Sequence, residues 1–275
     1  MSRIATVGDN VIDVYAALGR VFPGGNTVNV AVAARRSGAA TAYLGATGAG
    51  PDGAVVRAAL AAEQVETTRM RVLDGPNAYS TIALVDGDRV FGLHELGVSV
   101  FRLDEADLAY LSQFWCVHTG ECSSTEDQLA DLAAVARVSF DFSDRPADYY
   151  EPLLAHVWLA CFSGSHLSSE EAVALADRAA AAGPELVLVT EGPRGALLRT
   201  ADGEITRAPA RQFRPVDTLG AGDAVIGGVL ARLMLGDGPE AALRAGQDLA
   251  AVSCGHYGAF GYGENLDDRW TAVIA

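Results

Sequence analysis

The residue types needed for phosphate chemistry occur together in one string, Asp217-Thr218-Leu219-Gly220-Ala221-Gly222-Asp223, which leads into an apolar helical pattern. The three small residues Gly220, Ala221 and Gly222 let the backbone turn sharply and present N–H groups at the positive end of a helix dipole, where phosphate binds. Asp223 falls in the first helical turn, where its carboxylate can accept a proton from a hydroxyl group. The string predicts phosphoryl transfer to a hydroxyl, with Asp223 as the base; the alternative is a tight strand-to-helix turn without catalysis.

The basic residues narrow the ways in which phosphate can be bound. All 20 of them are arginine and none is lysine. This excludes the lysine of a Walker-type phosphate loop, a Schiff-base lysine and the strand lysine of protein kinases. Backbone N–H groups, arginine or a metal ion must therefore handle the phosphate.

A second polar group near the N-terminus has the residue types that bind a polyol. Glycines let the main chain approach hydroxyl groups closely, asparagine offers a donor and acceptors, and carboxylates accept hydrogen bonds from sugars. The candidate substrate-binding residues here are Asp9, Asp13, Gly24, Gly25, Asn26 and Asn29. For Asp9 and Asp13 a helix cap or a solvated turn is the alternative interpretation.

Three strings together resemble the ribokinase-like (PfkB) carbohydrate kinase family. The D-T-x-G-A-G-D signature is complete at 217–223, G-G-x-x-x-N matches at 24–29, and T-x-G-x-x-G matches at 190–195. The resemblance implies ATP as phosphoryl donor, Asp223 as catalytic base, and Gly220, Ala221 and Gly222 as the anion hole for the γ-phosphate. It also implies a nucleotide site, for which the candidates are Thr190, Gly192, Gly195 and Gly258. A hairpin loop is the alternative for 190–195.

The resemblance carries expectations about cations as well. Asp217 and Thr218 lie where the family often builds a monovalent-cation site, which would bind K⁺. The family's N-x-x-E motif, which helps to organise Mg²⁺, should follow the strand at 158–162, yet residues 163–170 contain no asparagine. We expect Glu170 to approach Mg²⁺ through water, or ATP to hold most of the metal itself. A second departure is a glycine at the usual aspartate within 47–53.

Several local strings resemble the fructoselysine 6-kinase branch of this family: GDNVIDVY, FPGGNTVNVAV, DGDRVFG and FDFSD. That branch implies phosphorylation of the 6-hydroxyl of a fructose unit that carries an amino-acid amine. Arg89 would then bind the substrate carboxylate, and Glu121 a hydroxyl or ammonium group, unless both are solvent-facing. The alternatives are a PfkB kinase for ribose, a nucleoside or a keto-deoxy sugar acid, and a catalytically silent sugar- or nucleotide-binding relative.

The elements that must position these residues alternate along the chain. Strand patterns occur at 4–7, 41–45, 115–118, 138–142, 158–162, 186–190, 196–200 and 204–208, and helical patterns at 26–37, 53–63, 168–182, 222–235 and 239–253. Ser168 and Glu171 fit a capping box. This rhythm predicts an α/β fold, and the resemblance implies a three-layer ribokinase-like sandwich with a mostly parallel sheet. We expect one domain over 1–275, with a β lid formed by about 10–22 and 67–100 and a hairpin turn at 86–88.

Charge and hydropathy exclude other partners. The net charge of −15 disfavours nucleic acid and anionic membranes, which need a basic face. The sequence has no apolar run of 18 residues, which argues against a membrane span. Its four cysteines are not spaced as a zinc site and are most simply free thiols, which favours a cytoplasmic protein. By resemblance alone, we expect a homodimer that pairs through the lid.

Overall fold

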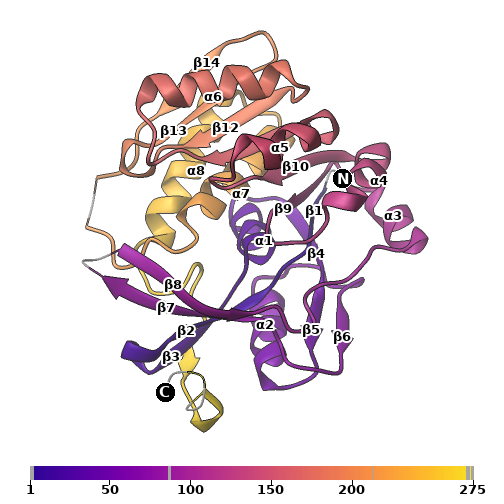
Figure 1. Ribbon diagram of the computed structural model, residues 1–275, viewed down its shortest axis with the longest axis vertical. Helices are drawn as coiled ribbons and strands as arrows, with labels where there is room; N and C mark the ends of the chain where they lie inside the picture. The colour runs from indigo at the N-terminus through magenta and orange to yellow at the C-terminus, as the bar shows by residue number, and fades with distance from the viewer. Residues whose placement is uncertain (1–2, 86–87, 213, 271–272, 274–275) are drawn as a thin grey trace.

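A central eight-stranded sheet forms the middle layer of the protein in the computed structural model, which describes residues 3–85, 88–212, 214–270 and 273 (Figure 1). Its order is β14-β13-β12-β11-β10-β9-β1-β4, parallel from β12 to β4 and antiparallel at β13 and β14. The strands are β1 (Arg3–Val7), β4 (Ala40–Leu44), β9 (Cys116–Gly120), β10 (Arg137–Asp141), β11 (Leu159–Ser163), β12 (Leu186–Thr190), β13 (Ala196–Arg199) and β14 (Ile205–Ala208). The predicted mostly parallel sheet is confirmed.

Helices cover both faces of this sheet. One face packs against α1 (Asn26–Arg36), α7 (Ala221–Met234) and α8 (Pro239–Ser253), and the other against α3 (Glu105–Leu111), α4 (Leu129–Val135), α5 (Ala147–Tyr150) and α6 (Ser169–Ala181). Alternate strand residues enter the two cores: Val117 packs on the α4 side, whereas its neighbour Cys116 packs on the α7 side. Strands buried on both faces read as nearly continuous apolar runs, which is why the sequence pattern located them. The three-layer α/β fold is confirmed.

A second sheet lies beside the first and contains strands from both segments that we expected to form a lid. Its order is β15-β3-β2-β7-β8, and Figure 1 shows it at the lower left. Its strands are β2 (Val11–Tyr15), β3 (Arg20–Gly24), β7 (Tyr79–Val85), β8 (Asp88–Glu95) and β15 (Glu264–Asn265). The range 67–100 expected for the lid contributes only β7 and β8, because β6 (Arg71–Leu73) pairs with β5 (Ala46–Gly48) beneath α2 (Pro51–Ala62). Residues 86–87 of the expected turn lie outside the described residues.

Local signals explain where several elements begin. The predicted capping box is present: Ser168 Oγ accepts from the Glu171 N–H at 3.2 Å, and Glu171 accepts from the Ser168 N–H at 2.7 Å. The short 3₁₀ turns are η1 (Ala16–Leu18), η2 (Glu126–Gln128), η3 (Glu151–His156), η4 (Gly192–Arg194) and η5 (Asp268–Trp270). Among the described residues, no helix is long and apolar enough to cross a membrane.

Candidate active site

The candidate site lies where the carboxyl ends of β1, β9 and β10 meet the N-termini of α1 and α7. Asp9 follows β1, Glu121 follows β9 and Asp141 ends β10, while Asn26 and Asp223 open the two helices. Parallel α/β sheets place ligands at this edge because loops and helix N-termini converge there. Hydrogen bonds join residues of these five elements.

Asp223 lies in the first turn of α7 and is held by two asparagines of α1. Asn26 Nδ2 donates to Asp223 Oδ1 at 2.8 Å, and Asn29 Nδ2 donates to Asp223 Oδ2 at 2.7 Å. Both bonds stabilise an ionised carboxylate in a fixed orientation. Asn29 Oδ1 is buried and has no hydrogen-bond partner among the described residues, so this acceptor is available to a donor.

The Gly220–Gly222 loop has the geometry of an anion site. Gly220 is the N-cap of α7 in the left-handed conformation (φ +75°), and no side chain caps the helix. A Cβ at Gly220 would overlap Ala259, so only glycine fits there, whereas the space beside Gly222 is open. N–H groups in the first turn of this 14-residue helix attract negative charge, and the N–H of Ala221 also bonds the Thr218 carbonyl at 3.3 Å.

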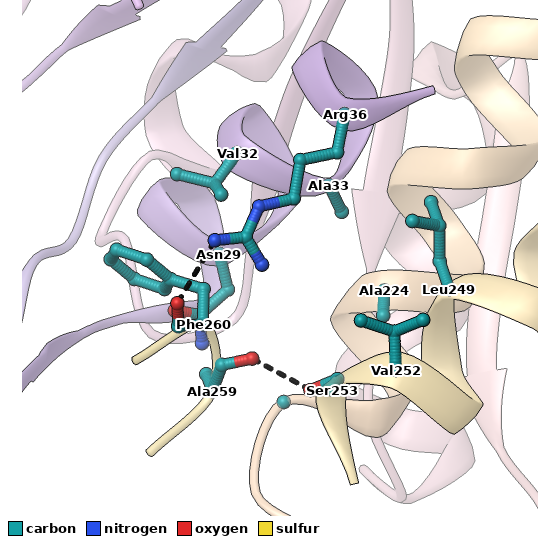
Figure 2. Close-up of a pocket in the computed structure, with 11 residues that line it drawn as sticks. Asn29, Val32, Ala33, Arg36, Ala224, Leu249, Val252, Ser253, Ala259 and Phe260 are labelled. Carbon is teal, nitrogen blue, oxygen red and sulfur yellow. Dashed lines mark hydrogen bonds between the residues drawn. The ribbon is translucent and has the colours of Figure 1, made fainter. Parts of the chain in front are cut away.

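Behind this loop, α1, α7 and α8 close a small cavity of about 20 Å³ against the segment after α8 (Figure 2). Arg36 donates to the Phe260 carbonyl at 3.0 Å, and Ser253 Oγ donates to the Ala259 carbonyl at 2.6 Å. These two bonds fix the segment that limits the conformation of Gly220. The cavity is too small for a sugar or a nucleotide. The residues that line it pack behind the loop.

Asp141 is a second carboxylate beside Asp223; its place in FDFSD indicates either electrostatic support on the phosphate side or a helix cap. Asn26 Nδ2 donates to Asp141 Oδ2 at 2.8 Å as well as to Asp223, so a single amide joins the two carboxylates. Burial, and then the negative charge of Asp223, raise the pKa of Asp141 to about 7. The signal in the sequence was its position at the end of a buried strand, within FDFSD.

Asp9 caps α1 from outside the helix. Its carboxylate accepts from the N–H groups of Asn26 (2.7 Å) and Thr27 (3.2 Å) and from Ser123 Oγ (3.1 Å). Burial raises the pKa of Asp9 above its ordinary value, and these hydrogen bonds oppose that rise. Asp9 thereby orients the N-terminus of α1, on which both asparagines that hold Asp223 lie.

Asp13 and Gly24 lie together on the lid sheet. Asp13 on β2 is 3% exposed, and a Cβ at Gly24 on β3 would overlap its carboxylate. Gly25 follows with φ +107°, and a Cβ there would come within 2.7 Å of the Asn10 Cα. The two glycines therefore give the carboxylate room and bring the chain into α1.

Glu121 is oriented by an ion pair at the edge of the site. Arg145 Nε and Nη2 donate to Glu121 Oε2 at 2.9 and 2.6 Å, and Cys122 Sγ donates to Oε1 at 3.1 Å. The Glu121 N–H bonds the Asp141 carbonyl at 3.0 Å, which places Glu121 next to the second carboxylate. Arg89 lies on β8, and its side chain is outside the described part of the structure.

The expected nucleotide loop follows β12 as η4. Gly192 has φ +59° and Gly195 φ +111°, and a Cβ at Gly195 would overlap the Ala208 carbonyl. Glu191, 2% exposed, accepts from Arg207 Nη1 at 2.5 Å and anchors the loop to β14. Thr190 Oγ1 donates to the Phe162 carbonyl at 3.3 Å.

Asp217, expected near a monovalent cation, is instead surrounded by hydrogen-bond donors. Its carboxylate accepts from Tyr15 Oη at 2.5 Å, the Leu219 N–H at 2.9 Å and the Gly258 N–H at 3.0 Å. These donors turn the positive ends of their dipoles toward the carboxylate, as a cation would. The carboxylate of Asp217 therefore does not need a cation to balance its charge, because both of its oxygens already accept hydrogen bonds.

Comparison with known proteins identifies the family. The model of the pfkB family of carbohydrate kinases matches residues 2–261. The chain belongs to this family. It is therefore a sugar kinase, as the sequence strings predicted. The structure of ribokinase from Arabidopsis thaliana complexed with ribose and ATP is similar in fold, with a TM-score of 0.83 and 17% identity over 95% of this chain and 96% of that one.

Two curated relatives belong to the predicted branch. The fructosamine kinase FrlD of Bacillus subtilis is 38% identical over 95% of this chain and 94% of its own length. The fructoselysine 6-kinase of Escherichia coli is 33% identical over 94% of this chain and 100% of its own. The resemblance to fructosamine-type kinases is therefore confirmed along nearly the whole chain.

Proposed function

We propose that this kinase transfers the γ-phosphoryl group of ATP to the 6-hydroxyl of fructoselysine or a related fructosamine, with Asp223 as the general base. The observation that carries the proposal is the position of Asp223, held by two asparagines of α1, in the helical turn that begins at Gly220, Ala221 and Gly222. The proposed base for the hydroxyl and the proposed site for the phosphate thus both lie at the N-terminus of α7. The relatives named fructosamine kinase and fructoselysine 6-kinase support the acceptor.

In the proposed reaction the acceptor oxygen attacks the γ-phosphorus, the bond from this phosphorus to the β–γ bridging oxygen breaks, and ADP leaves. The hydroxyl proton passes to Asp223 as the new O–P bond forms. The N–H groups of the 220–222 loop stabilise the charge on the transferred group. The nucleotide would lie along Thr190, Gly192, Gly195 and Gly258.

The sugar would lie between the lid sheet and α1, against Asp13, Gly24, Gly25 and Asn29. A sugar hydroxyl can supply the donor that Asn29 Oδ1 lacks. Asp9 would hold the start of α1, and Asn26 would hold the base. Arg89 and Glu121 would bind the amino-acid part of the substrate.

Magnesium accompanies ATP in this proposal. Among the described residues no three His, Cys, Asp or Glu side chains form a metal cluster, and Glu170 is exposed in the first turn of α6. We propose that the Asp141 carboxylate lies near this ion, because Mg²⁺ uses one or two carboxylates together with phosphate oxygens and water. The bound ion would neutralise charge on the phosphates.

The lid would join two copies of the chain into a homodimer. Three residues of β8, Val90, Phe91 and Leu93, are 49%, 57% and 63% exposed, which leaves apolar side chains uncovered along the edge strand of the lid sheet. The reducing cytoplasm is the proposed location, because none of the four cysteines, all within the described residues, forms a disulfide.

A panel of acceptors tests the function. We expect turnover of ATP with fructoselysine or another fructosamine to exceed turnover with ribose, nucleosides and keto-deoxy sugar acids. Strong turnover with one of the latter and none with fructosamines would assign a different acceptor. Nucleotide binding without transfer to any sugar would show a silent relative.

A further inference from the structure

A line of buried polar side chains runs from the interior of the sheet to the base. Ser139 Oγ on β10 lies 3.0 Å from His118 Nδ1 on β9, and His118 Nε2 lies 3.2 Å from Asn26 Oδ1. Asn26 Nδ2 then contacts Asp141 and Asp223 at 2.8 Å each. Ser139 and His118 are both 0% exposed.

The two carboxylates set the direction of every bond in this line. Because both are acceptors, Asn26 must point its NH₂ group toward them, one hydrogen to each. Its Oδ1 then faces His118 and needs a donor, so His118 Nε2 must carry the proton. His118 Nδ1 is left as an acceptor for the Ser139 hydroxyl. For a neutral imidazole, no other assignment of the protons satisfies all of these contacts.

His118 can hold this state because it stays neutral. Burial lowers the pKa of His118 to about 3, and within the described residues its two ring nitrogens face Ser139 and Asn26. A neutral imidazole has one N–H and one acceptor nitrogen, which is what Asn26 and Ser139 require on its two sides.

We propose that His118 is a positioning residue for catalysis: its Nε2–H fixes the amide of Asn26, which in turn holds Asp223 in the orientation that receives the proton. His118 touches neither substrate and acts only through Asn26. The inference rests on Asp223 being the base, as proposed above. Asn29 on α1 donates a second hydrogen bond to Asp223, so loss of His118 should weaken the orientation of the Asp223 carboxylate without abolishing it.

Removal of the Nε2–H has a definite electrostatic consequence. Asn26 Oδ1 becomes a buried acceptor without a donor, and the amide gains by turning away from its present orientation. Asp223 then loses one of its two amide donors and faces the nearby charge of Asp141 with less compensation. Its carboxylate would keep a proton up to higher pH.

Two substitutions separate positioning from packing. His118→Leu removes the donor but keeps an apolar side chain of similar size, whereas His118→Gln places an amide N–H where Nε2 stands. We expect kcat to fall about tenfold in His118→Leu, with the KM values for ATP and sugar little changed, and to recover most of that loss in His118→Gln. The acid limb of the kcat–pH profile should move to higher pH in the leucine variant alone.

The decisive measurement uses the wild-type protein and the ¹⁵N NMR signals of its imidazole rings. The proposal requires the Nε2–H tautomer of His118, assigned with the His118→Gln protein as reference. An Nδ1–H tautomer, equal kcat in the two variants, or a loss confined to KM would each overturn it. The tautomer is read without turnover, so it stands apart from a failure of the proposed function, which an Asp223→Asn variant with normal kcat would reveal.

Discussion

At the scale of single residues, the site concentrates negative charge around one amide. Asp141 and Asp223 share the NH₂ group of Asn26, and Asp9 caps the helix on which Asn26 lies. Burial first, and then the charge of the nearby Asp223, raise the pKa of Asp141 to about 7. A phosphoryl-transfer site can use such charge, because the metal that accompanies ATP compensates it.

Replacement of the base gives the most direct prediction. Asp223→Asn keeps the size and the contacts of the side chain but cannot accept the proton, so kcat should fall by about 100-fold or more while the binding of sugar and ATP persists. Steady-state kinetics and calorimetric binding measure the two effects. Asp131→Asn, an exposed position on α4, is the matched control. Near-normal kcat in Asp223→Asn would refute the assigned role.

Asp141 should make stability depend on pH. Its folded-state pKa of about 7 lies above the ordinary value of 3.8, so the folded protein binds more protons between these limits than the unfolded chain does. This contribution to the free energy of unfolding is full below about pH 4 and is lost as pH rises to about 7. Urea denaturation at pH 5 and pH 8 should therefore show a smaller loss of stability in Asp141→Asn than in the wild type. An identical loss in both would contradict the assignment.

The hydrogen bond from Tyr15 to Asp217 leads us to expect no requirement for potassium. Because the carboxylate already accepts three hydrogen bonds, exchange of K⁺ for tetramethylammonium at constant ionic strength should leave kcat within about twofold. Tyr15→Phe removes one donor and should lower activity in either salt or create a dependence on K⁺. Strong activation of the wild type by K⁺ would show that the ion binds despite these donors.

At the scale of elements, the position of the catalytic loop depends on how closely α7 packs against α1 and α8. A Cβ at Gly227 would come within 2.6 Å of the Ala33 Cβ, and one at Gly228 within 2.7 Å of the Gly246 Cα. These glycines bring the helix that carries Asp223 next to the helix that carries Asn26 and Asn29. The side chains of Asn26 and Asn29 are then long enough to reach Asp223.

Gly227→Ala should therefore separate α7 from α1. We expect a loss of about 1–3 kcal/mol in the free energy of unfolding, typical of overpacking, together with reduced kcat. Gly238→Ala is the control, because the space beside Gly238 is open and its backbone is extended, so the change should cost less than about 1 kcal/mol. Equal stability of the two variants would mean that the helices adjust without cost.

At the scale of the whole molecule, the lid sheet draws strands from three distant parts of the chain. β2 and β3 come from the N-terminal part, β7 and β8 from the middle, and β15 from residues 264–265. The sheet leaves β8 at its edge with exposed apolar side chains. An exposed strand edge of this kind is commonly covered by another chain.

The proposed dimer is tested by mass in solution. Sedimentation of the wild type should give twice the monomer mass, and Leu93→Asp, which places a charge on the exposed face of β8, should give the monomer. Leu235→Asp, an exposed leucine at the end of α7, is the matched control and should leave the dimer intact. A wild type that sediments as a monomer at all concentrations would end this proposal.

Much of this protein could be predicted from the sequence because the signals are local. The Gly220–Gly222 turn, the Ser168–Glu171 capping box and the apolar strands each depend on neighbouring residues, so the α/β fold and the place of Asp223 in the first turn of a helix followed from the pattern. The tertiary structure alone decided the contacts between distant residues. Tyr15 meets Asp217, Asn26 joins Asp141 to Asp223, and His118 supports Asn26. Such contacts depend on which strands pair and how closely helices pack, and no short stretch of sequence encodes either.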